Sequence, residues 1–554
     1  MDNRFRRTGL LGALILCAAA MLPGQAMASS KAQPGRPDCA RLTGLRLAKV
    51  EITSAVLAPA GQEVSAAPTV SSRQTVTLAA HCRVNAVARP TRDSEIGIEI
   101  WLPVEGWNGK YQQVGNGGWA GAIHHAPLAD ALRRGYAAAA TDNGHTGGLT
   151  DDGRGVRSAA FAIGHPEKLI DFGYRALSQT HDVALAVIQA FYGREAARSY
   201  FVGCSDGGRE ALMVAQRFPD AFDGVLAGNP GNDWSRWGAG LVWAQQAQLA
   251  DAPGVIPTTK RSIIQSAVMA ACDGIDGVVD GLITDPRACR FDPAVLLCGG
   301  AERADCLTAD QVATLRKLYQ GPRNPRTGEQ IYPGHPPGVE GALIAPVQPG
   351  AFSYGASYFG QVVFERPDWD FRTLDFDRDI AVSDRKSAPM VDATSPDLRS
   401  FRARGGKLIH YHGWADGLMP AERSIQYHDA VAGFMAQYPD PRNAGPEAVD
   451  SFYRLFLVPG MGHCYGGDGP TTIAPIDMAA ADPQYDLVLA LERWVENDVA
   501  PRQFIGAGNA LLDPSKTMTR PICAYPLAPR YRGAGDSNDA ANFACAASTT
   551  LETP

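Results

Sequence analysis

Beyond its first residues the sequence lacks any long apolar run. Residues 9–22 are apolar, but they fall short of the roughly 20 residues that a membrane helix needs, and no later segment reaches that length. Three arginines precede this run, and Ala26-Met27-Ala28 follows it with the small-x-small pattern of signal peptidase cleavage. We therefore expect residues 1–28 to be a signal peptide, with a retained anchor as the alternative. The mature protein is then secreted or periplasmic, without stable membrane association.

Basic clusters and nucleotide-binding spacings are also missing. The chain has 51 Lys and Arg against 58 Asp and Glu, and no long basic run interrupts that balance, so no nucleic-acid partner is expected. The glycine loop Gly115-Asn116-Gly117-Gly118 lacks the G-x-G-x-x-G spacing of a dinucleotide site. These absences leave the classes of protein that act on small molecules.

No two cysteines form a C-x-x-C pair, which removes support for zinc ribbons and for thioredoxin chemistry. The chain has 11 cysteines, of which Cys17 lies in the expected signal peptide. Ten cysteines remain. An even number in an exported chain indicates disulfides.

Strand-like and helix-like runs alternate from residue 97 onward. Strand-like segments lie at 97–102, 111–114, 136–141 and 199–203, and residues 171–191 have helical spacing. Such alternation predicts an α/β fold, in which helices cover both faces of a mostly parallel sheet.

The pattern weakens between residues 232 and 400 and resumes with a strand-like run at 407–411. A chain of 554 residues is too long for one compact core. We therefore expect residues 29–231 and 401–554 to form one catalytic domain, with residues 232–400 inserted as a lid domain over its active face.

The pentapeptide Gly203-Cys204-Ser205-Asp206-Gly207 matches G-x-S-x-G in an informative context. An apolar strand at 200–202 precedes it, and a helix-compatible run at 209–218 follows. Flanking glycines in a strand–turn–helix let a strained turn expose the serine hydroxyl, as in the nucleophile elbow of α/β-hydrolases. The alternative is a glycine turn that holds an incidental serine.

A nucleophilic serine needs a base and an orienting acid, which follow it in this fold in the order Asp or Glu, then His. Of the later histidines, only His463 stands in a glycine turn just after a late strand; His410 and His412 flank a strand end, and His428 lies on a predicted helix. Asp416 occupies a loop directly after a strand. We predict Ser205, Asp416 and His463 as the catalytic triad.

An oxyanion hole in such enzymes uses the backbone N–H after the nucleophile and one from an earlier glycine loop. The corresponding donors here are Asp206 and Gly118, with Gly117 also possible.

A cysteine stands beside each of two predicted catalytic residues, in Cys204-Ser205 and in His463-Cys464. Together with Gly207-Gly208-Arg209-Glu210 and with His412-Gly413 ahead of Asp416, this arrangement resembles the tannase/feruloyl esterase family. The resemblance covers residues 39–545. It implies an α/β-hydrolase core, a lid that holds a calcium ion, and small-molecule aromatic esters as substrates.

The resemblance also implies a disulfide that joins the two catalytic loops, Cys204–Cys464. Short separations in sequence, together with the resemblance, suggest four more bonds: Cys39–Cys82, Cys272–Cys289, Cys298–Cys306 and Cys523–Cys545.

The calcium ion is assigned to the segment 272–282. Asp273, Asp276 and Asp280 stand at short spacing among glycines, and the carbonyls of Val278 and Leu282 complete an oxygen-only ligand set that suits a hard cation. Spacing alone also fits a solvated acidic loop, and the resemblance favours calcium.

The expected activity is that of a serine carboxylic-ester hydrolase that cleaves esters of aromatic or phenolic acids through an acyl-enzyme. A mono(2-hydroxyethyl) terephthalate-type substrate, a serine peptidase and a catalytically inactive binding protein are the alternatives. We expect Trp414 to contact substrate because its loop also holds Asp416. The lid contributes further aromatic side chains, most of which we expect in its own core: Trp234, Trp237, Trp243, Phe352, Tyr354, Tyr358 and Phe359.

Overall fold

The structure is a computed structural model that describes residues 38–65, 75–147, 158–348, 353–438, 449–473, 482–508 and 518–547. The predicted signal peptide at residues 1–28 and Phe352 of the predicted lid lie outside these residues.

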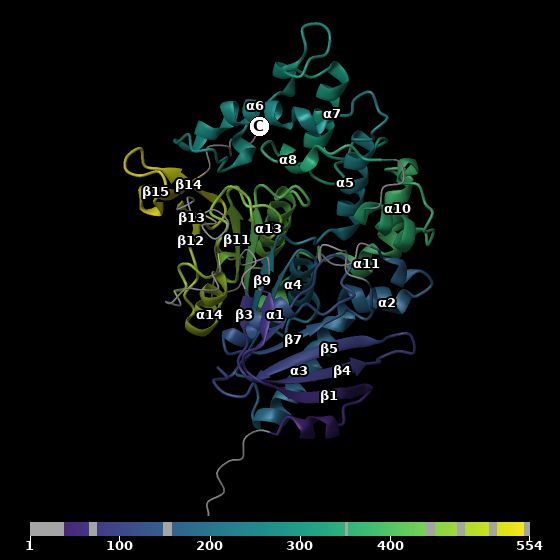
Figure 1. The fold of residues 1–554 in the computed structure, drawn as a ribbon, viewed down its shortest axis with the longest axis vertical. Coiled ribbons are helices and arrows are strands. Elements are labelled where there is room, and N and C mark those ends of the chain that lie inside the picture. The colour runs from purple at the N-terminus through teal and green to yellow at the C-terminus, as the bar shows by residue number, and fades with distance from the viewer. Residues whose placement is uncertain are drawn as a thin grey trace, which may run out of the picture. The chain divides into compact units, whose positions relative to one another are not determined.

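A mixed β-sheet forms the centre of the described chain (Figure 1). Its strands are β1 (Val50–Ala58), β4 (His81–Ala88), β5 (Ile96–Pro103), β6 (Lys110–Val114), β7 (Ala137–Thr141), β8 (Arg198–Cys204), β9 (Gly224–Gly228), β10 (Lys407–Gly413) and β11 (Tyr453–Val458). They are hydrogen-bonded in the order β1-β4-β5-β7-β6-β8-β9-β10-β11. Pairing is antiparallel from β1 to β7 and parallel from β7 to β11, so the carboxyl ends of β8, β9, β10 and β11 share one edge.

Helices cover both faces of this sheet, because successive strand side chains point to opposite sides. Val225 and Ala227 of β9 belong to one buried cluster, and Leu226 between them belongs to another. The first cluster includes side chains of α3 (Ala176–Tyr192), α4 (Asp206–Arg217) and α13 (Glu422–Ala436), and the second those of α1 (His125–Arg133) and α14 (Leu487–Asn497). The predicted α/β fold is confirmed.

The segment 232–400 lies between β9 and β10, and its described residues add no strand to the central sheet. Its α-helices are α5 (Trp234–Ala247), α6 (Arg261–Cys272), α7 (Ala309–Gln320), α8 (Glu340–Leu343), α9 (Tyr354–Ser357), α10 (Arg378–Lys386), α11 (Ala388–Val391) and the start of α12 (Arg399–Ala403). An aromatic cluster buries Trp234, Trp237, Tyr358 and Phe359 of this segment together with Trp119 of the flanking chain. That the segment acts as a lid stays a prediction.

The remaining described α-helix and strands are short. They are α2 (Pro166–Ile170) and the strand pairs β2 (Glu63–Ser65) with β3 (Thr75–Thr77), β12 (Gln503–Ala507) with β13 (Thr519–Cys523), and β14 (Leu527–Tyr531) with β15 (Phe543–Ala547). No helix that the structure describes combines the length and the apolar character needed to cross a bilayer.

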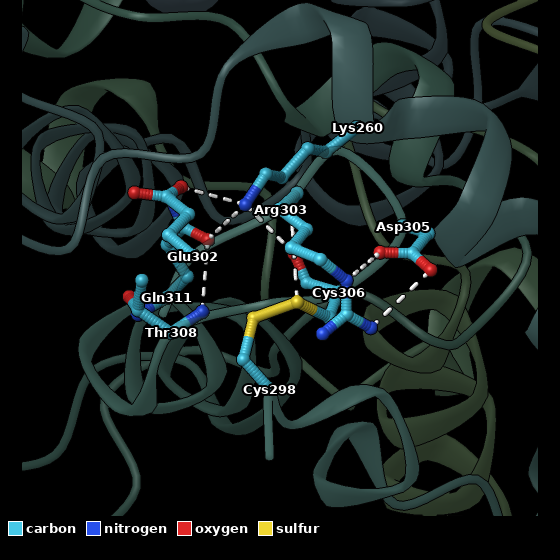
Figure 2. Close-up of a disulfide and its surroundings, with 8 residues drawn as sticks. All are labelled: Lys260, Cys298, Glu302, Arg303, Asp305, Cys306, Thr308 and Gln311. Carbon is cyan, nitrogen blue, oxygen red and sulfur yellow. Dashed lines mark hydrogen bonds and ion pairs between the residues drawn. A yellow bond between two sulfur atoms is a disulfide. The ribbon is translucent and has the colours of Figure 1, made fainter. Parts of the chain in front are cut away.

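All five predicted disulfides are present: Cys39–Cys82, Cys204–Cys464, Cys272–Cys289, Cys298–Cys306 and Cys523–Cys545. Figure 2 shows how one of them, Cys298–Cys306, lies beside the buried ammonium group of Lys260. Lys260 Nζ donates to Glu302 Oε1 at 2.7 Å, to the Cys306 carbonyl at 2.7 Å and to Gln311 Oε1 at 2.9 Å. These three acceptors satisfy the donors of a charge that is otherwise costly to bury.

Candidate active site

A sharp turn joins β8 to α4 and places Ser205 at its apex. Ser205 has φ 65° and ψ −121°, a backbone conformation that residues other than glycine rarely adopt. The backbone crowds closely around the turn: a Cβ on Gly203 would overlap the carbonyl oxygen of Gly207, and one on Gly208 would overlap that of Gly228. Only glycine lets α4 approach the strand ends so closely, and the turn has the strand–turn–helix form that the motif predicts.

The three predicted triad residues lie in one hydrogen-bonded chain. His463 Nε2 is 2.8 Å from Ser205 Oγ, and His463 Nδ1 is 2.8 Å from Asp416 Oδ2. A neutral imidazole that donates from Nδ1 accepts the serine proton at Nε2, which is the arrangement that general-base activation of a hydroxyl requires.

The Asp416 carboxylate is buried, with 1% of its surface exposed. It accepts the backbone N–H of Leu418 at 2.8 Å and of Met419 at 3.0 Å. Burial by itself raises the pKa of Asp416, but the charge of His463 and hydrogen bonds from His412 and His463 outweigh it, so the pKa lies well below its ordinary value. Asp416 is therefore ionised at any pH at which His463 acts as a base.

The other late histidines have structural partners. His412 lies with Nε2 2.9 Å from the Met419 carbonyl and with Nδ1 2.7 Å from Ser424 Oγ. His410 Nδ1 is 2.8 Å from the hydroxyl of Tyr453. Burial holds the pKa of His410 well below its ordinary value, which keeps this imidazole neutral in the sheet.

Asn229 is a site residue that the sequence reasoning missed. It follows β9 with φ 34°, and its side-chain amide donates to Asp416 Oδ2 at 2.8 Å and to the Gly462 carbonyl at 3.3 Å. One side chain thus links the acid loop to the histidine loop. A polar residue directly after the Gly224–Gly228 strand was the available signal, but that strand was itself unpredicted.

The Cys204–Cys464 bond ties the residue before Ser205 to the residue after His463, across a sequence separation of 260. Cys464 has φ 67°, so the backbone turns sharply as it leaves the histidine. The bond therefore constrains the two loops that carry Ser205 and His463.

The predicted oxyanion donors lie beside the elbow. The Asp206 N–H opens α4, where the helix dipole favours negative charge. Gly118 has φ 60°, and the loop before it is bonded to the elbow, because the Gly207 N–H donates to the Asn116 carbonyl at 2.8 Å. That Asp206 and Gly118, or Gly117, bind an oxyanion stays a prediction.

The structure places Trp414 in the core cluster that α13 joins, with 4% of its surface exposed. The guanidinium of Arg287, from the inserted segment, lies 5.4 Å from its ring centroid. That Trp414 contacts the substrate stays a prediction.

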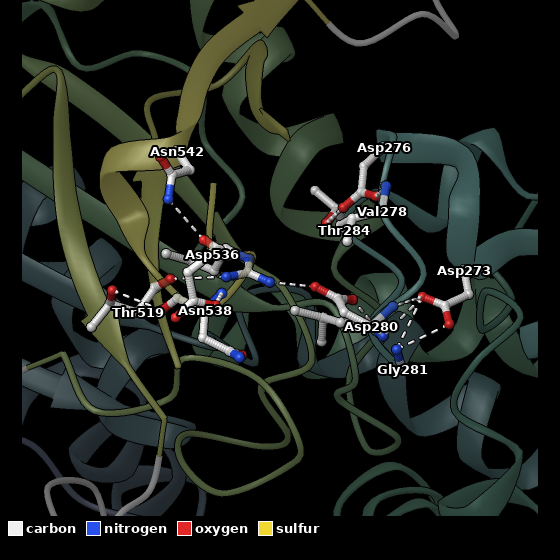
Figure 3. Close-up of polar contacts among 12 residues, drawn as sticks. Asp273, Asp276, Val278, Asp280, Gly281, Thr284, Thr519, Asp536, Asn538 and Asn542 are labelled. Carbon is white, nitrogen blue, oxygen red and sulfur yellow. Dashed lines mark hydrogen bonds and ion pairs between the residues drawn. The ribbon is translucent and has the colours of Figure 1, made fainter. Parts of the chain in front are cut away.

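The predicted calcium ligands occupy one loop, drawn in Figure 3. Asp273 accepts the backbone N–H groups of Asp280, Gly281 and Leu282, and Asp280 pairs with the buried Arg520. Asp276 accepts the Val278 N–H and the hydroxyl of Thr284. Within the described ranges, no three His, Cys, Asp or Glu side chains are gathered so that they could hold a metal ion.

Comparison with known proteins decides the family. The model of the family described as tannase and feruloyl esterase matches residues 82–546. The chain belongs to this tannase and feruloyl esterase family.

The similarity to individual proteins covers most of the chain. An uncharacterized esterase of Xanthomonas campestris pv. campestris is 42% identical over 535 residues, which are 92% of this chain and 91% of that protein. The mono(2-hydroxyethyl) terephthalate hydrolase of Piscinibacter sakaiensis is 33% identical over 552 residues, with 87% of each chain covered. A probable feruloyl esterase B-1 of Aspergillus oryzae is 32% identical over 517 residues, 90% of this chain and 92% of its own.

Solved structures agree with this placement. The crystal structure of feruloyl esterase B from Aspergillus oryzae matches with a TM-score of 0.81 and 31% identity, covering 92% of this chain and 99% of that one. Tannin acyl hydrolase from Aspergillus niger, at 23% identity and a TM-score of 0.71 over 90% and 92% of the two chains, supports the fold. The α/β-hydrolase fold is thereby confirmed, and the protein is a carboxylic ester hydrolase with a small-molecule ester substrate.

Replacing Asn229 tests its link between the acid and histidine loops. We expect Asn229→Ala to lower kcat about 10- to 100-fold, because a hydrogen bond to a charged group contributes about 1.5–3 kcal/mol. Steady-state kinetics on a nitrophenyl ester measures this. The control is Asn85→Ala, which removes a 2.9 Å bond to Ser54 Oγ away from the site. An Asn229→Ala enzyme as active as the Asn85→Ala control contradicts the assignment.

Proposed function

We propose that this esterase is a secreted serine hydrolase that cleaves esters of aromatic or phenolic acids through an acyl-enzyme. The observation that carries the proposal is the hydrogen-bonded chain from Ser205 through His463 to Asp416, with both links at 2.8 Å. It supports hydrolysis against an inactive binding protein, because all three groups are present in a competent geometry.

In the first half of the reaction Ser205 Oγ attacks the ester carbonyl carbon, and His463 Nε2 takes its proton. The resulting imidazolium is stabilised by Asp416, and the oxyanion by the N–H groups of Asp206 and Gly118. His463 then gives the proton to the alkoxy oxygen, so the alcohol leaves and the acid half stays bonded to Ser205.

Water completes the reaction. His463 takes a proton from the attacking water, a second oxyanion forms at the same donors, and the proton returns to Ser205 Oγ as the carboxylic acid departs. The net change is the addition of one water to one ester, and neither half requires a redox partner.

Removing the nucleophile tests this mechanism. Ser205→Ala should lower kcat by several orders of magnitude without loss of the fold, because the acyl-enzyme cannot form. Ester turnover and labelling by a fluorophosphonate probe measure the two consequences, and circular dichroism reports the fold. A Ser205→Ala enzyme that keeps its activity and its labelling excludes the proposed triad.

Three observations support an aromatic acid as the acyl half. The inserted segment contributes a cluster of aromatic side chains, Trp414 lies in the loop of the catalytic acid, and relatives are named for feruloyl and terephthalate esters. Aromatic rings stack on flat substrates and exclude water from the bond that is cleaved. A mono(2-hydroxyethyl) terephthalate-type ester is the second candidate, supported by the relative of that name.

The acyl preference is measured by comparing feruloyl, galloyl and hydroxyethyl-terephthaloyl esters with short aliphatic esters of similar leaving group. We expect a higher kcat/KM for the aromatic set, and a smaller preference in Trp414→Ala because the proposed contact between Trp414 and the substrate is lost. Equal kcat/KM for both sets in the wild type leaves a generic esterase.

We also place the protein outside the cytoplasm. Five disulfides support this proposal, because such bonds form and persist in oxidising compartments. The signal-like residues 1–28 agree with it.

Calcium at the 272–282 loop is part of the proposal. The carboxylates of Asp273, Asp276 and Asp280 and the carbonyls of Val278 and Leu282 offer only oxygen ligands, which suit a hard cation. Binding an ion would require these carboxylates to exchange their present N–H, hydroxyl and Arg520 partners. A bound ion would crosslink the loop that the Cys272–Cys289 bond closes and would supply no reacting group.

Chelation tests the ion. Removing calcium should lower Tm, and adding it back should restore Tm, because a ligand of the native state stabilises that state. Asp273→Asn should make Tm insensitive to chelator. If Tm is the same in metal-free and calcium-loaded protein, the segment is an acidic loop held by its own hydrogen bonds and by Arg520.

A further inference from the structure

Three charged side chains lie fully buried on α4 directly behind the nucleophile. Asp206, Arg209 and Glu210 each have 0% of their surface exposed. Arg209 pairs with Asp206 and donates to the carbonyls of Gly173 at 2.8 Å and Phe172 at 3.1 Å. Arg209 therefore bonds α4 to the π-helical turn Asp171–Arg175, which lies between α2 and α3. Glu210 has no role in the reaction described above.

Glu210 reaches away from α4 toward the predicted oxyanion loop. Its Oε2 accepts the backbone N–H of Asn116 at 3.0 Å, and its Oε1 accepts the side-chain amide of Asn143. Asn143 follows β7 and Asn116 follows β6. One carboxyl group thus connects the nucleophile helix to the loops after two neighbouring strands.

The N–H, the carbonyl and the side chain of Asn116 are all hydrogen-bonded. Its N–H donates to Glu210, its carbonyl accepts the N–H of Gly207 at 2.8 Å, and its side chain donates to the Thr141 carbonyl at 2.7 Å. The loop is also in contact with the elbow: a Cβ on Gly115 would lie 2.6 Å from Gly207 Cα and 2.9 Å from Glu210 Oε2. The peptide that leads into Gly117 and Gly118 is therefore positioned by α4 itself.

The protonation of Glu210 fits this role. Burial, followed by the charge of Asp206, raises the pKa of Glu210 to about 8, against the effect of Arg209 and the hydrogen bonds from Asn143 and Asn116. Asp206 Oδ2 is buried and has no donor among the described N–H and O–H groups; burial raises the pKa of Asp206, and its interactions with Arg209 and Glu210 lower it. A protonated Glu210 supplies the missing donor and avoids two adjacent buried anions.

We propose that Glu210 is a positioning residue that holds the oxyanion loop 115–118 against the nucleophile elbow, through its bonds to the Asn116 N–H and the Asn143 side chain. Glu210 touches no reacting atom. It acts by fixing where the N–H groups of Gly117 and Gly118 lie relative to Ser205. The inference rests on the proposed function, because it needs Ser205 as nucleophile and this loop as an oxyanion donor.

The test is Glu210→Gln. In the wild type, each of the two N–H donors bonds a different oxygen of Glu210. A glutamine has one acceptor oxygen, so at least one of the two bonds is lost. Misplacing an oxyanion donor weakens the transition state more than the ground state. We expect kcat to fall about 10- to 100-fold, KM to change less than about threefold, and the affinity for an arylboronic acid transition-state analogue to fall with kcat/KM.

Glu340→Gln is the matched control. Glu340 also has 0% exposure, and its Oε1 alone accepts both the backbone N–H of Gly338 at 2.9 Å and the hydroxyl of Tyr319 at 2.6 Å, within the inserted segment. A glutamine at 340 can keep both bonds on its one carbonyl oxygen, so Glu340→Gln tests the removal of a buried carboxyl group as such, and we expect no change in kcat or in boronic acid affinity. A Glu210→Gln enzyme with wild-type kcat and boronic acid affinity overturns the inference. A fall in boronic acid affinity that is equally large in Glu340→Gln also overturns it.

Asn143→Gly keeps the test decisive if the Glu210 variant does not fold. Asn143 has φ 60°, so glycine adopts its backbone freely while removing the donor to Glu210. We expect kcat to fall with little change in KM, as in Glu210→Gln but to a smaller extent. An unchanged kcat overturns the proposal. Labelling by a fluorophosphonate separates the role of Glu210 from the role of Ser205 as nucleophile. The Glu210 and Asn143 variants should bind one fluorophosphonate per chain, more slowly than the wild type. A Ser205→Ala enzyme that is labelled rejects the triad itself.

Discussion

The close approach of α4 to the carboxyl ends of β8 and β9 is the constraint on which the site depends. Glycines at 203 and 208 let the helix begin directly against these strands, and Gly207 lets it approach the loop after β6, since any Cβ there would overlap a backbone atom. The chain accommodates this by placing Ser205 at φ 65°, which exposes the hydroxyl and leaves the first N–H of the helix beside it. The exposure of the Ser205 hydroxyl and the strain of its backbone therefore have the same origin.

The parallel part of the sheet brings the other site residues to the Ser205 turn. β8, β9, β10 and β11 are successive neighbours, and the loops that follow them contribute Ser205, Asn229, Asp416 and His463 respectively. Because parallel strands end at one edge, groups separated by as many as 258 residues meet within hydrogen-bonding distance. The Cys204–Cys464 bond then joins the first of these loops to the last.

Much of the core could be predicted from local pattern. The strand-like segments 97–102, 111–114 and 199–203 became β5, β6 and β8, because apolar runs bounded by turns form buried strands whatever surrounds them. β9 was missed: Gly-Val-Leu-Ala-Gly is short, has glycine at both ends and is buried on both faces, so neither length nor alternation marks it. The strands β1 and β4 also went unpredicted, although their pairing extends the sheet by two strands.

The sequence by itself determined the elbow, the order of Ser205, Asp416 and His463, and the even set of cysteines, because each depends on residue type and on neighbours a few positions away. Only the tertiary structure decided which distant groups support them. Asn229 reaches Asp416 across 187 positions, and Glu210 reaches Asn116 across 94. Such contacts depend on how strands pair and how closely a helix packs on them, and those distances are set by the whole sheet rather than by any local pattern.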